Sequence, residues 1–389
     1  MLDRILGRTV ASTHRSILLL GPRQTGKSTL LSALKPDFTI NLALERVFLQ
    51  YSASPQELEE VLAERKPQVV FIDEIQRLPS LLNTIQALLD DAKLAKQKLR
   101  FLLTGSSARK LKRGKANLLP GRVFVFELGP LVGAELDYQV STAKALSVGM
   151  LPEPYLETST LTAHRLLSSY AATYLKEEIQ AEALTRNLEG FSRFLFAAAA
   201  TSGKFLDFSK LAQQAKVSRT STIRFFEMLE DTLIAHKVPP FVAASSADTI
   251  KHPRYFFFDT GVLNGLLGDF AIPPDRIGFL FEHLLFNQLR VSALAHERQC
   301  HIYGFRTRGG LEIDFIVELE NKNGSRDIWA IEAKTGNFDP HTSQAVFAQA
   351  QRYLPAKTKF IIATNGTEKK KLTLCRVLPW QVLLREMGI

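Results

Sequence analysis

Residues 15–34 read RSILLLGPRQTGKSTLLSAL, an apolar run followed by a glycine-rich turn and an amphipathic segment. The turn fits the pattern G-x-x-x-x-G-K-[ST], which is typical of a loop that holds phosphate between a strand and a helix. Gly21 and Gly26 allow the backbone to turn so that its amide groups point at phosphate oxygens. Lys27 brings a positive charge to the β- and γ-phosphates, and Ser28 offers a hydroxyl to magnesium. The segment therefore predicts a site for ATP and Mg²⁺.

Two later strands support this prediction, because polar residues follow each of them. The stretch PQVVFIDE ends in Asp73, which would hold magnesium through water, and Glu74, which would orient or deprotonate the attacking water. The stretch LRFLLTGSS offers Thr104 and Ser106 to sense the γ-phosphate. This order favours an ATPase over a small GTPase or a kinase; the alternative is a chance match with solvated strand ends. The predicted nucleotide-binding residues are Gly21, Pro22, Arg23, Gln24, Thr25, Gly26, Lys27, Ser28, Thr29, Asp73 and Ser106, with Ser28 and Asp73 on the metal.

A basic segment, ARKLKRGKANLLPGR, lies between this region and the next apolar strand. Its lysines are expected to be solvated. Arg122 immediately precedes the strand, and a rigid mount of this kind suits an arginine finger that reaches the γ-phosphate of a neighbouring subunit. Arg109 is the second candidate. Either assignment predicts a homo-oligomer, for which a hexamer is one form.

The middle of the chain predicts a winged helix-turn-helix. In DFSKLAQQAKVSRTSTIRFFEMLEDTLIAHKVPPF, Asp207 can cap one short helix and Ser218 a second. The stretches AHKVPPF and RYFFFDTG would form the two sides of the wing. The alternative is a module that packs against its own chain or a neighbouring subunit. In the DNA-binding version, the residues that face the groove are Arg219, Thr220, Ser221 and Arg224.

Near the end of the chain, the apolar strand IWAIEAK carries Glu332 and Lys334 two residues apart, which puts both on one face. The hairpin RTRGGLEIDFIVEL places Asp314 on a neighbouring strand. Two carboxylates can hold a divalent cation, and the lysine can position water and neutralise charge at a scissile phosphate. The set therefore predicts a metal-dependent phosphodiesterase, with Asp314 and Glu332 on the metal. The alternative is a surface salt bridge at a sheet end.

Other polar side chains accompany this set. Glu282 stands among apolar neighbours in the helix IGFLFEHLLFNQL and joins Asp314, Glu332 and Lys334 as a predicted catalytic residue. In QAQRY, Gln349 and Tyr353 are four residues apart on one helix face. The remaining carboxylates near Asp314, which rank lower, are Glu312 and Glu318.

The composition describes an ordinary soluble globular protein with a basic balance. Its 389 residues are 46% hydrophobic and carry a net charge of +10, with a pI near 9.5. The length suits two or three domains, and the charge favours a polyanionic partner, of which nucleic acid is the usual one and DNA the expected one here. Cys300 and Cys375 lack metal-ligand spacing and are expected to be reduced thiols. With no apolar run of membrane-spanning length, the expected location is the cytoplasm.

The chain resembles the prokaryotic AAA-type ATPases that carry a C-terminal domain of unknown function with a restriction-endonuclease-like core. The matching stretches include GPRQTGKSTLL, VVFIDEIQRLPSLLNTIQ, FLLTGSSARKL, RYFFFDTGVLNGLLG, LEIDFIVE and IEAKTG. The last two resemble the PD-(D/E)XK nuclease pattern, and QAQRY resembles the Gln-x-x-x-Tyr helix of RecB-like nucleases, which contributes DNA contacts. The resemblance implies an α/β chain of three domains: a P-loop AAA-type ATPase domain at 1–155, a helical and winged-helix domain at 156–250, and a PD-(D/E)XK nuclease-like α/β domain at 251–389.

Three functions fit these features. The first is an ATP-driven machine that binds or moves along DNA, including branched DNA, while the C-terminal domain cuts or clamps it. The second is an ATP-dependent switch or scaffold, whose nuclease-like fold recognises nucleic acid or a protein without cutting. The third, a protein-remodelling ATPase, leaves the nuclease-like fold without a task. The carboxylate and lysine set and the positive charge favour the first function.

Overall fold

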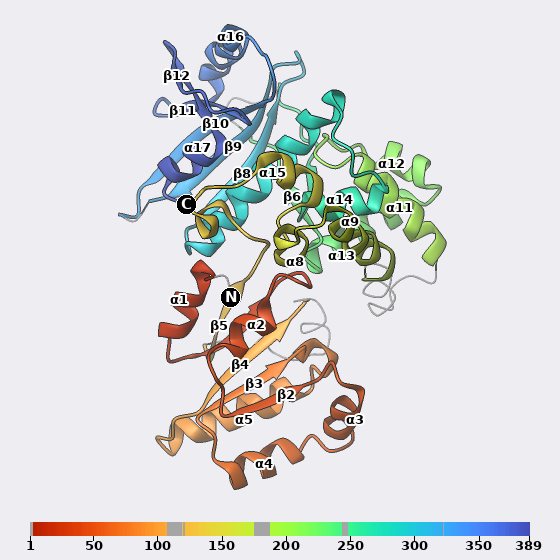
Figure 1. Ribbon diagram of the computed structural model, residues 1–389, viewed down its shortest axis with the longest axis vertical. Helices are drawn as coiled ribbons and strands as arrows, with labels where there is room; N and C mark the ends of the chain where they lie inside the picture. Colours follow the sequence, from red (N-terminus) through yellow and green to blue (C-terminus); the bar gives the residue numbers. More distant parts are fainter. Residues whose placement is uncertain (1–2, 107–118, 120, 175–186, 243–247, 322) are drawn as a thin grey trace. The chain divides into compact units, whose positions relative to one another are not determined.

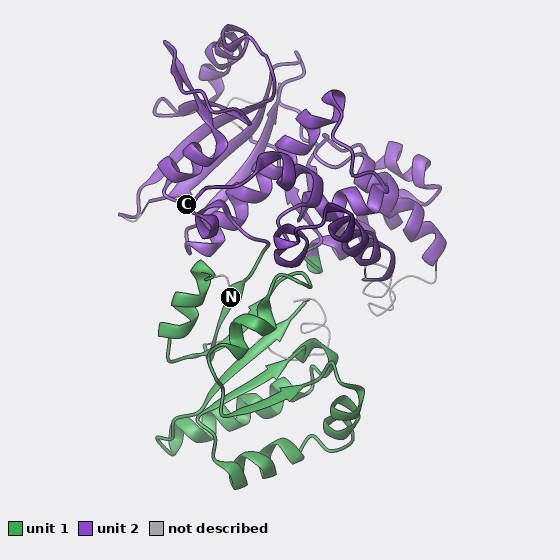
Figure 2. Ribbon diagram, in the orientation of Figure 1, with its two compact units in different colours: residues 1–129, 231–233 green, residues 130–230, 234–389 purple. Residues whose placement is uncertain are grey.

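The chain is divided into two compact units in a computed structural model that describes residues 3–106, 119, 121–174, 187–242, 248–321 and 323–389. Unit 1 comprises residues 1–129 with 231–233, and unit 2 comprises residues 130–230 with 234–389 (Figure 1, Figure 2). The sequence places its first boundary at residue 155, whereas compact packing begins a new unit at residue 130. Apart from residues 231–233, the two later predicted domains lie together in unit 2. Arg109 lies outside the described residues.

Unit 1 is built on a five-stranded sheet of order β2-β3-β4-β1-β5, in which all neighbouring strands are parallel. The side chains of β1 alternate between two cores: Leu18 faces one core, while Ile17 and Leu19 face the other. Both faces of the sheet are therefore covered, as the continuous apolar runs of β1 and β4 require. The elements are α1 (Ile5–Ser12), β1 (Ser16–Leu20), α2 (Lys27–Ser32), β2 (Phe38–Asn41), α3 (Glu45–Ala53), α4 (Glu57–Arg65), β3 (Val69–Asp73), η1 (Ile75–Arg77), α5 (Leu81–Leu94), β4 (Arg100–Gly105) and β5 (Val123–Glu127).

The first part of unit 2 is mainly helical and includes a two-stranded antiparallel sheet. Asp207 caps α12 by accepting from the backbone N–H groups of Ser209 and Lys210, and Ser218 accepts from the N–H of Ser221 in α13. Helices at 208–215 and 219–231 and strands at 235–238 and 254–257 form where the sequence predicts them, and the winged-helix arrangement stays a prediction. The elements are η2 (Gly133–Leu136), α7 (Thr142–Val148), α8 (Pro152–Leu156), α9 (Thr160–Ser169), η3 (Tyr170–Tyr174), α11 (Leu188–Ala200), α12 (Phe208–Ala215), α13 (Arg219–Asp231), β6 (Ala235–Val238), β7 (Arg254–Phe257) and α14 (Thr260–Leu267).

The second part of unit 2 contains a six-stranded mixed sheet of order β12-β13-β11-β10-β9-β8. Strands β8, β9 and β10 are antiparallel neighbours, whereas β10, β11 and β13 are parallel. Ile316 and Ala330 pack with Phe347 of α16, whereas Phe315 contacts Phe286 of α15. The elements are α15 (Pro274–Ala295), β8 (Cys300–Arg306), β9 (Glu312–Glu320), β10 (Arg326–Lys334), α16 (Pro340–Ala350), η4 (Gln351–Tyr353), β11 (Lys359–Thr364), β12 (Lys370–Lys371), β13 (Cys375–Pro379) and α17 (Trp380–Met387).

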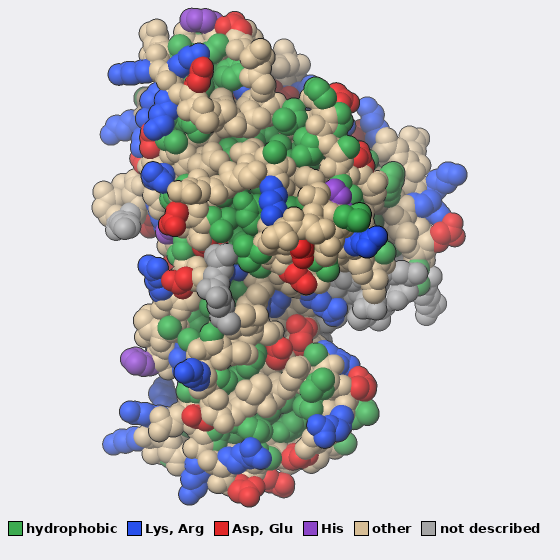
Figure 3. All heavy atoms as spheres, viewed as in Figure 1, with side chains coloured by type: hydrophobic (Ala, Val, Ile, Leu, Met, Phe, Trp, Pro, Cys, Tyr) green, Lys and Arg blue, Asp and Glu red, His purple; other side chains and the backbone are tan. Residues whose placement is uncertain are grey.

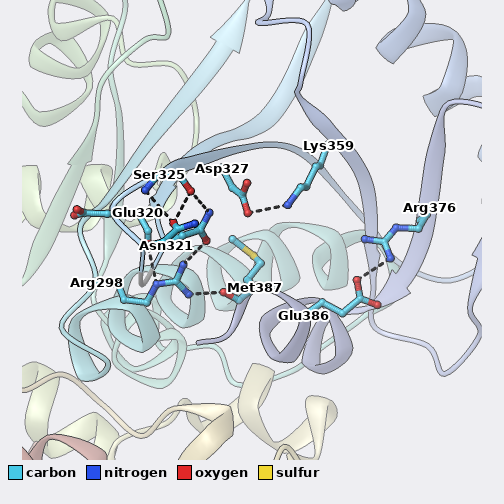
Figure 4. A network of polar contacts seen from close by, with 10 residues as sticks. Arg298, Glu320, Asn321, Ser325, Asp327, Lys359, Arg376, Glu386 and Met387 are labelled. Atoms are coloured by element: carbon cyan, nitrogen blue, oxygen red, sulfur yellow. Dashed lines mark hydrogen bonds and ion pairs between the residues drawn. The ribbon is translucent and has the colours of Figure 1, made fainter.

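A polar network joins the end of α15 to the last helix (Figure 4). Arg298 donates to the carbonyl oxygen of Glu320 at 2.7 Å, to Asn321 Oδ1 at 3.1 Å and to the carbonyl oxygen of Met387. Nearby, Lys359 pairs with Asp327, and a further ion pair joins β13 to α17. The contacts of Arg298 with Met387 and of Arg376 with Glu386 hold α17 beside the sheet. None of the helices described is long and apolar enough to cross a membrane.

Candidate functional sites

The P-loop conformation requires glycine at two positions. Gly26 has φ of 92° directly before α2, and Gly21 has φ of 154° directly after β1. A Cβ atom at Gly21 would lie 2.2 Å from the carbonyl oxygen of Leu128. Both are glycines because the backbone bends through conformations that other residues rarely adopt.

Polar side chains from three elements meet at the carboxyl edge of the unit 1 sheet. Ser28 Oγ of α2 donates to Asp73 Oδ1 of β3 at 2.7 Å, and Thr104 Oγ1 of β4 donates to the same carboxylate oxygen. The backbone N–H of Glu74 donates to Thr104 Oγ1 at 3.0 Å. Lys27 is buried, and its ammonium donates to the carbonyl oxygens of Gly21 and Pro22, at 2.8 Å each. The structure thus brings the predicted metal-binding pair, Ser28 and Asp73, into direct contact.

Gln76 forms hydrogen bonds with two of the predicted residues, Glu74 and Ser106, and was not itself predicted from the sequence. Its Nε2 donates to Glu74 Oε2 and, at 3.0 Å, to Ser106 Oγ. Glu74 itself has φ of 59°, a left-handed conformation that turns the chain sharply after β3. Gln76 Oε1 is buried without a hydrogen-bond partner among the described residues. In the sequence, this role could have been inferred from the position of Gln76, which is two residues after Glu74 in the turn that follows the strand.

The oxygen atoms at this edge fit a magnesium ion. The hydroxyl of Ser28 and the carboxylate of Asp73 are hard oxygen ligands, and Mg²⁺ usually takes one or two carboxylates and keeps several waters. Within the described residues, no three His, Cys, Asp or Glu side chains gather to hold a metal by themselves. Water and phosphate oxygens would therefore complete the coordination, as is usual when Mg²⁺ binds together with a nucleotide.

Arg122 forms a two-pronged ion pair within its own chain. Its Nε donates to Asp90 Oδ1 at 2.9 Å, and its Nη2 donates to Asp90 Oδ2 at 2.8 Å. The hydrogen bond from Arg122 lowers the pKa of Asp90. Because β5 runs parallel to β1, Arg122 stands at the amino edge of the sheet, and the P-loop stands at the carboxyl edge. Arg122 therefore belongs to the edge of unit 1 opposite its own nucleotide site.

In unit 2, adjacent strands bring the carboxylates and the lysine together. Lys334 Nζ lies 2.7 Å from Glu332 Oε2, and Asp314 Oδ2 accepts from the backbone N–H of Ala333 at 2.7 Å. Glu332 is only 5% exposed. Burial and then the negative charge of Asp314 raise the pKa of Glu332 to about 8, although Lys334 opposes this shift. Burial lowers the pKa of Lys334, but Glu332 and Asp314 more than offset this, and the pKa of Lys334 lies above its ordinary value.

This donor set fits a divalent cation bound through two carboxylates. Burial, and then repulsion from the Asp314 carboxylate, disfavour ionisation of Glu332. A cation between the two carboxylates would relieve this repulsion. Glu312 is close enough to feel the charges of Asp314 and Lys334, and burial raises the pKa of Glu312. Glu318, the other spare carboxylate, lies further along β9 and pairs in register with Ile328 and His301.

Arg254 of β7 connects this site to the preceding segment, and sequence reasoning did not find it. Its side chain is 2% exposed and forms an ion pair with Glu282 of α15. It also donates to the carbonyl oxygen of Asp314 at 2.8 Å and to that of Gly203. Its guanidinium lies 4.9 Å from the ring centroid of Phe256. Glu282 is thus held beside β9 by a buried arginine, which stands at the start of the apolar stretch RYFFF.

The predicted nucleic-acid contacts lie on two helical segments. Arg219 and Arg224 are exposed on α13, whereas Thr222 and Phe225 of the same helix are buried. Gln349 is exposed near the end of α16. Tyr353, which follows in η4, is half-buried against Phe305, with ring centroids 5.4 Å apart. Their role in binding DNA remains a prediction.

Comparisons with known protein families divide the chain into three consecutive matches. Residues 13–136 match the family model described as AAA domain. Residues 140–271 and 277–383 match two domains of unknown function, DUF8612 and DUF4143. The first match covers most of unit 1, and the parallel sheet and the P-loop of this unit agree with an AAA domain.

Two mycobacterial proteins are similar to this chain in sequence, and both are named as uncharacterised. An uncharacterised protein of Mycobacterium tuberculosis and one of Mycobacterium bovis are each 26% identical over 318 residues, which cover 79% of this chain and 69% of the relative. Among solved structures, Aeropyrum pernix ORC1 in complex with DNA is 13% identical, with a TM-score of 0.31 over 68% of this chain and 91% of that chain. AMPPCP-bound DnaA from Aquifex aeolicus is 12% identical, with a TM-score of 0.27 over 58% and 84%. These scores are too low to support a functional argument.

Proposed function

We propose that the protein is an ATP hydrolase that acts in DNA processing. The single observation that carries the ATPase assignment is the meeting of Ser28, Asp73 and Thr104 at the carboxyl edge of the sheet, next to the P-loop. Hydroxyl and carboxylate oxygens at this position are ligands that a magnesium ion would accept when it binds together with a nucleotide. The AAA domain match over residues 13–136 supports the same function.

Each side chain has a separate task in this mechanism. Lys27 exchanges its contacts with the loop carbonyls for phosphate oxygens when the nucleotide binds. Ser28 and Asp73 would hold a metal ion, which would supply positive charge near the phosphates. Glu74 orients the attacking water and accepts its proton, and Gln76 fixes the direction of the Glu74 carboxylate.

The C-terminal site supports a second activity, metal-dependent cleavage of DNA. The specific observation is the convergence of Asp314, Glu332 and Lys334 on neighbouring strands, with Glu332 buried and its pKa raised to about 8. Asp314 and Glu332 would hold the cation, and Lys334 would contact the attacking water or the phosphate. This arrangement also underlies the assignment of the second half of unit 2 to the PD-(D/E)XK nuclease-like class.

The competing function is an ATP-dependent switch or scaffold that binds nucleic acid or a protein without cutting. The observation that favours it is the internal neutralisation of the site: Lys334 pairs with Glu332, and Glu282 pairs with Arg254. A site whose charges are already paired can persist as a binding surface without catalysis.

DNA cleavage separates the two functions. Supercoiled, linear, single-stranded and branched DNA are incubated with the protein and either Mg²⁺ or Mn²⁺, and the products are separated on denaturing gels. Cleavage by the wild type, together with its loss in Asp314→Asn and Lys334→Met, supports the nuclease. Glu318→Gln, further along β9, serves as the control and should cut like the wild type. If all four substrates stay intact with both metals while ATP is hydrolysed, the switch or scaffold replaces the nuclease.

A further inference from the structure

A hollow of about 590 Å³ lies on unit 2 where three segments of the chain meet. It is lined by Arg219 at the start of α13, by Lys251 and His252 in the segment before β7, and by Arg308 in the turn between β8 and β9. Phe208 adds an aromatic side chain to the lining. Two segments that the sequence assigns to separate domains thus share one basic concave surface.

The cations of this hollow are available to a ligand. Arg219, Lys251 and Arg308 are all exposed. Within the part of the chain that the structure describes, none of the three takes part in an ion pair. This distinguishes them from Arg254, Arg376 and Lys359, whose charges are paired with carboxylates. Three unpaired cations around one hollow create a positive potential that attracts an anion.

The backbone holds these cations in place. The Ser218 hydroxyl caps α13, which fixes the first turn and therefore Arg219. The backbone N–H of Arg308 donates to the carbonyl oxygen of Asp248 at 2.8 Å, and Thr249 forms a bridge with Thr307. The N–H of Ile250 donates to the carbonyl oxygen of Arg306 at 2.8 Å. The segment that carries Lys251 is therefore tied directly to the turn that carries Arg308.

We propose that this hollow binds the phosphate backbone of a nucleic-acid strand and guides it toward the carboxylates of β9 and β10. The proposal rests on the proposed function of unit 2 in DNA processing and names the surface that receives the substrate. Guanidinium groups hold phosphate oxygens through paired hydrogen bonds, and an aromatic side chain offers a surface to a base. A hollow built this way suits a repeating phosphate chain that passes through it.

The chain geometry connects the hollow to the candidate catalytic site. Arg308 precedes Asp314 by six positions, and an extended chain rises about 3.3 Å per residue, so the two lie at most about 20 Å apart. One strand of a duplex advances about 3.4 Å per phosphate. A strand held at Arg308 therefore reaches Asp314 within roughly six nucleotides.

Binding measured at several salt concentrations tests this proposal. Fluorescence anisotropy follows the full chain binding labelled single-stranded and duplex oligonucleotides, without ATP and with EDTA, so that neither hydrolysis nor cleavage affects the result. The variant R219A/K251A/R308A removes three charges from the hollow. The matched control K357A/K369A/K371A removes three exposed lysines around β11 and β12, where Figure 3 shows a group of basic side chains. In a separate titration, inorganic phosphate is added as a competitor.

The proposal expects binding to the wild type with a strong salt dependence. The hollow variant should lose at least tenfold in affinity, and its slope of log K against log salt should be smaller in magnitude by about 2 to 3, since each of the three lost contacts contributes about 0.7 to 0.9. The control should lose less than threefold. Equal losses in the two variants, no binding to the wild type, or full competition by millimolar phosphate would each overturn the proposal. ATP hydrolysis is assayed separately, so a failure of this proposal leaves the ATPase assignment standing.

Discussion

Arg254 and Glu282 form an ion pair in the interior of unit 2, between the strand β7 and the helix α15. Arg254 is nearly inaccessible to solvent, and its other contacts are backbone carbonyl oxygens and aromatic rings. Burial lowers the pKa of Arg254, and the carboxylates of Asp314, Glu312 and Glu332 oppose this effect. The arginine therefore compensates the acidic cluster as a whole as well as its direct partner.

Removing this arginine should destabilise unit 2 strongly. We expect Arg254→Met to lower the free energy of unfolding by about 3–5 kcal/mol, because it leaves a carboxylate without its buried partner. Arg376→Met breaks a partly exposed pair with Glu386 and should cost about 0–1 kcal/mol. Urea unfolding followed by circular dichroism measures both. The double variant Arg254→Met/Glu282→Gln should recover part of this loss of stability. Equal losses in Arg254→Met and Arg376→Met would contradict the stabilising role of Arg254.

The P-loop should not tolerate a side chain at Gly21. Gly21→Ala places a Cβ atom against the carbonyl oxygen of Leu128, so the loop must shift and its amide groups lose their direction toward phosphate. We expect at least a tenfold loss of ATP affinity, measured by isothermal titration calorimetry. Gly366→Ala is the control, since a Cβ atom there meets its nearest neighbour at 3.9 Å. Normal ATP binding by Gly21→Ala would show that the loop conformation is not required.

Arg122 as an arginine finger predicts that nucleotide sites are shared between subunits. Lys27→Ala and Arg122→Ala should each be inactive alone in ATP hydrolysis, and an equimolar mixture should recover part of the activity, because some sites combine one intact half from each variant. Asp90→Asn frees Arg122 from its partner and should retain activity. If Arg122 only stabilises the fold, Asp90→Asn and Arg122→Ala will lose activity together and the mixture will stay inactive.

A buried histidine makes unit 2 sensitive to acid. Burial lowers the pKa of His283 to about 4, so the imidazole is neutral in the folded chain and becomes protonated near pH 6.5 on unfolding. Between pH 6.5 and about 4, only the unfolded chain binds a proton at this position. The free energy of unfolding therefore has its full value above pH 6.5 and decreases as the pH falls toward 4, by roughly 3 kcal/mol in total. We expect His283→Gln to unfold with a flatter dependence on pH between 6.5 and 4. His341→Gln, at an exposed position, is the control, and an unchanged slope in His283→Gln would contradict the assignment.

The sequence predicts best those parts of the site that depend on local chain geometry. The P-loop and the Asp-Glu pair follow directly from short motifs, and parallel strands bring their ends to one edge of a sheet. Glu332 and Lys334 share a face because side chains alternate along a strand. In each case the required contact is set by residues close in sequence or by the regular geometry of a sheet.

Residues that act through distant contacts could not be predicted in the same way. Arg254 is 28 positions from Glu282 and 60 from Asp314, and only the packed fold shows that it serves both. Gln76 stands close to Glu74, but its contact with Ser106 depends on the neighbouring strand. Arg219, Lys251 and Arg308 line one hollow because segments that the sequence assigns to separate domains pack together.

The most direct test of the account is ATP hydrolysis by the purified chain, measured as phosphate release with Mg²⁺. The wild type should hydrolyse ATP. Lys27→Ala should neither bind nor hydrolyse ATP. Glu74→Gln should still be stabilised against heat by ATP, but its turnover should fall at least a hundredfold. Glu64→Gln, exposed on α4, should behave like the wild type. Turnover in Lys27→Ala equal to that of the wild type would contradict the claim that the nucleotide site of unit 1 hydrolyses ATP.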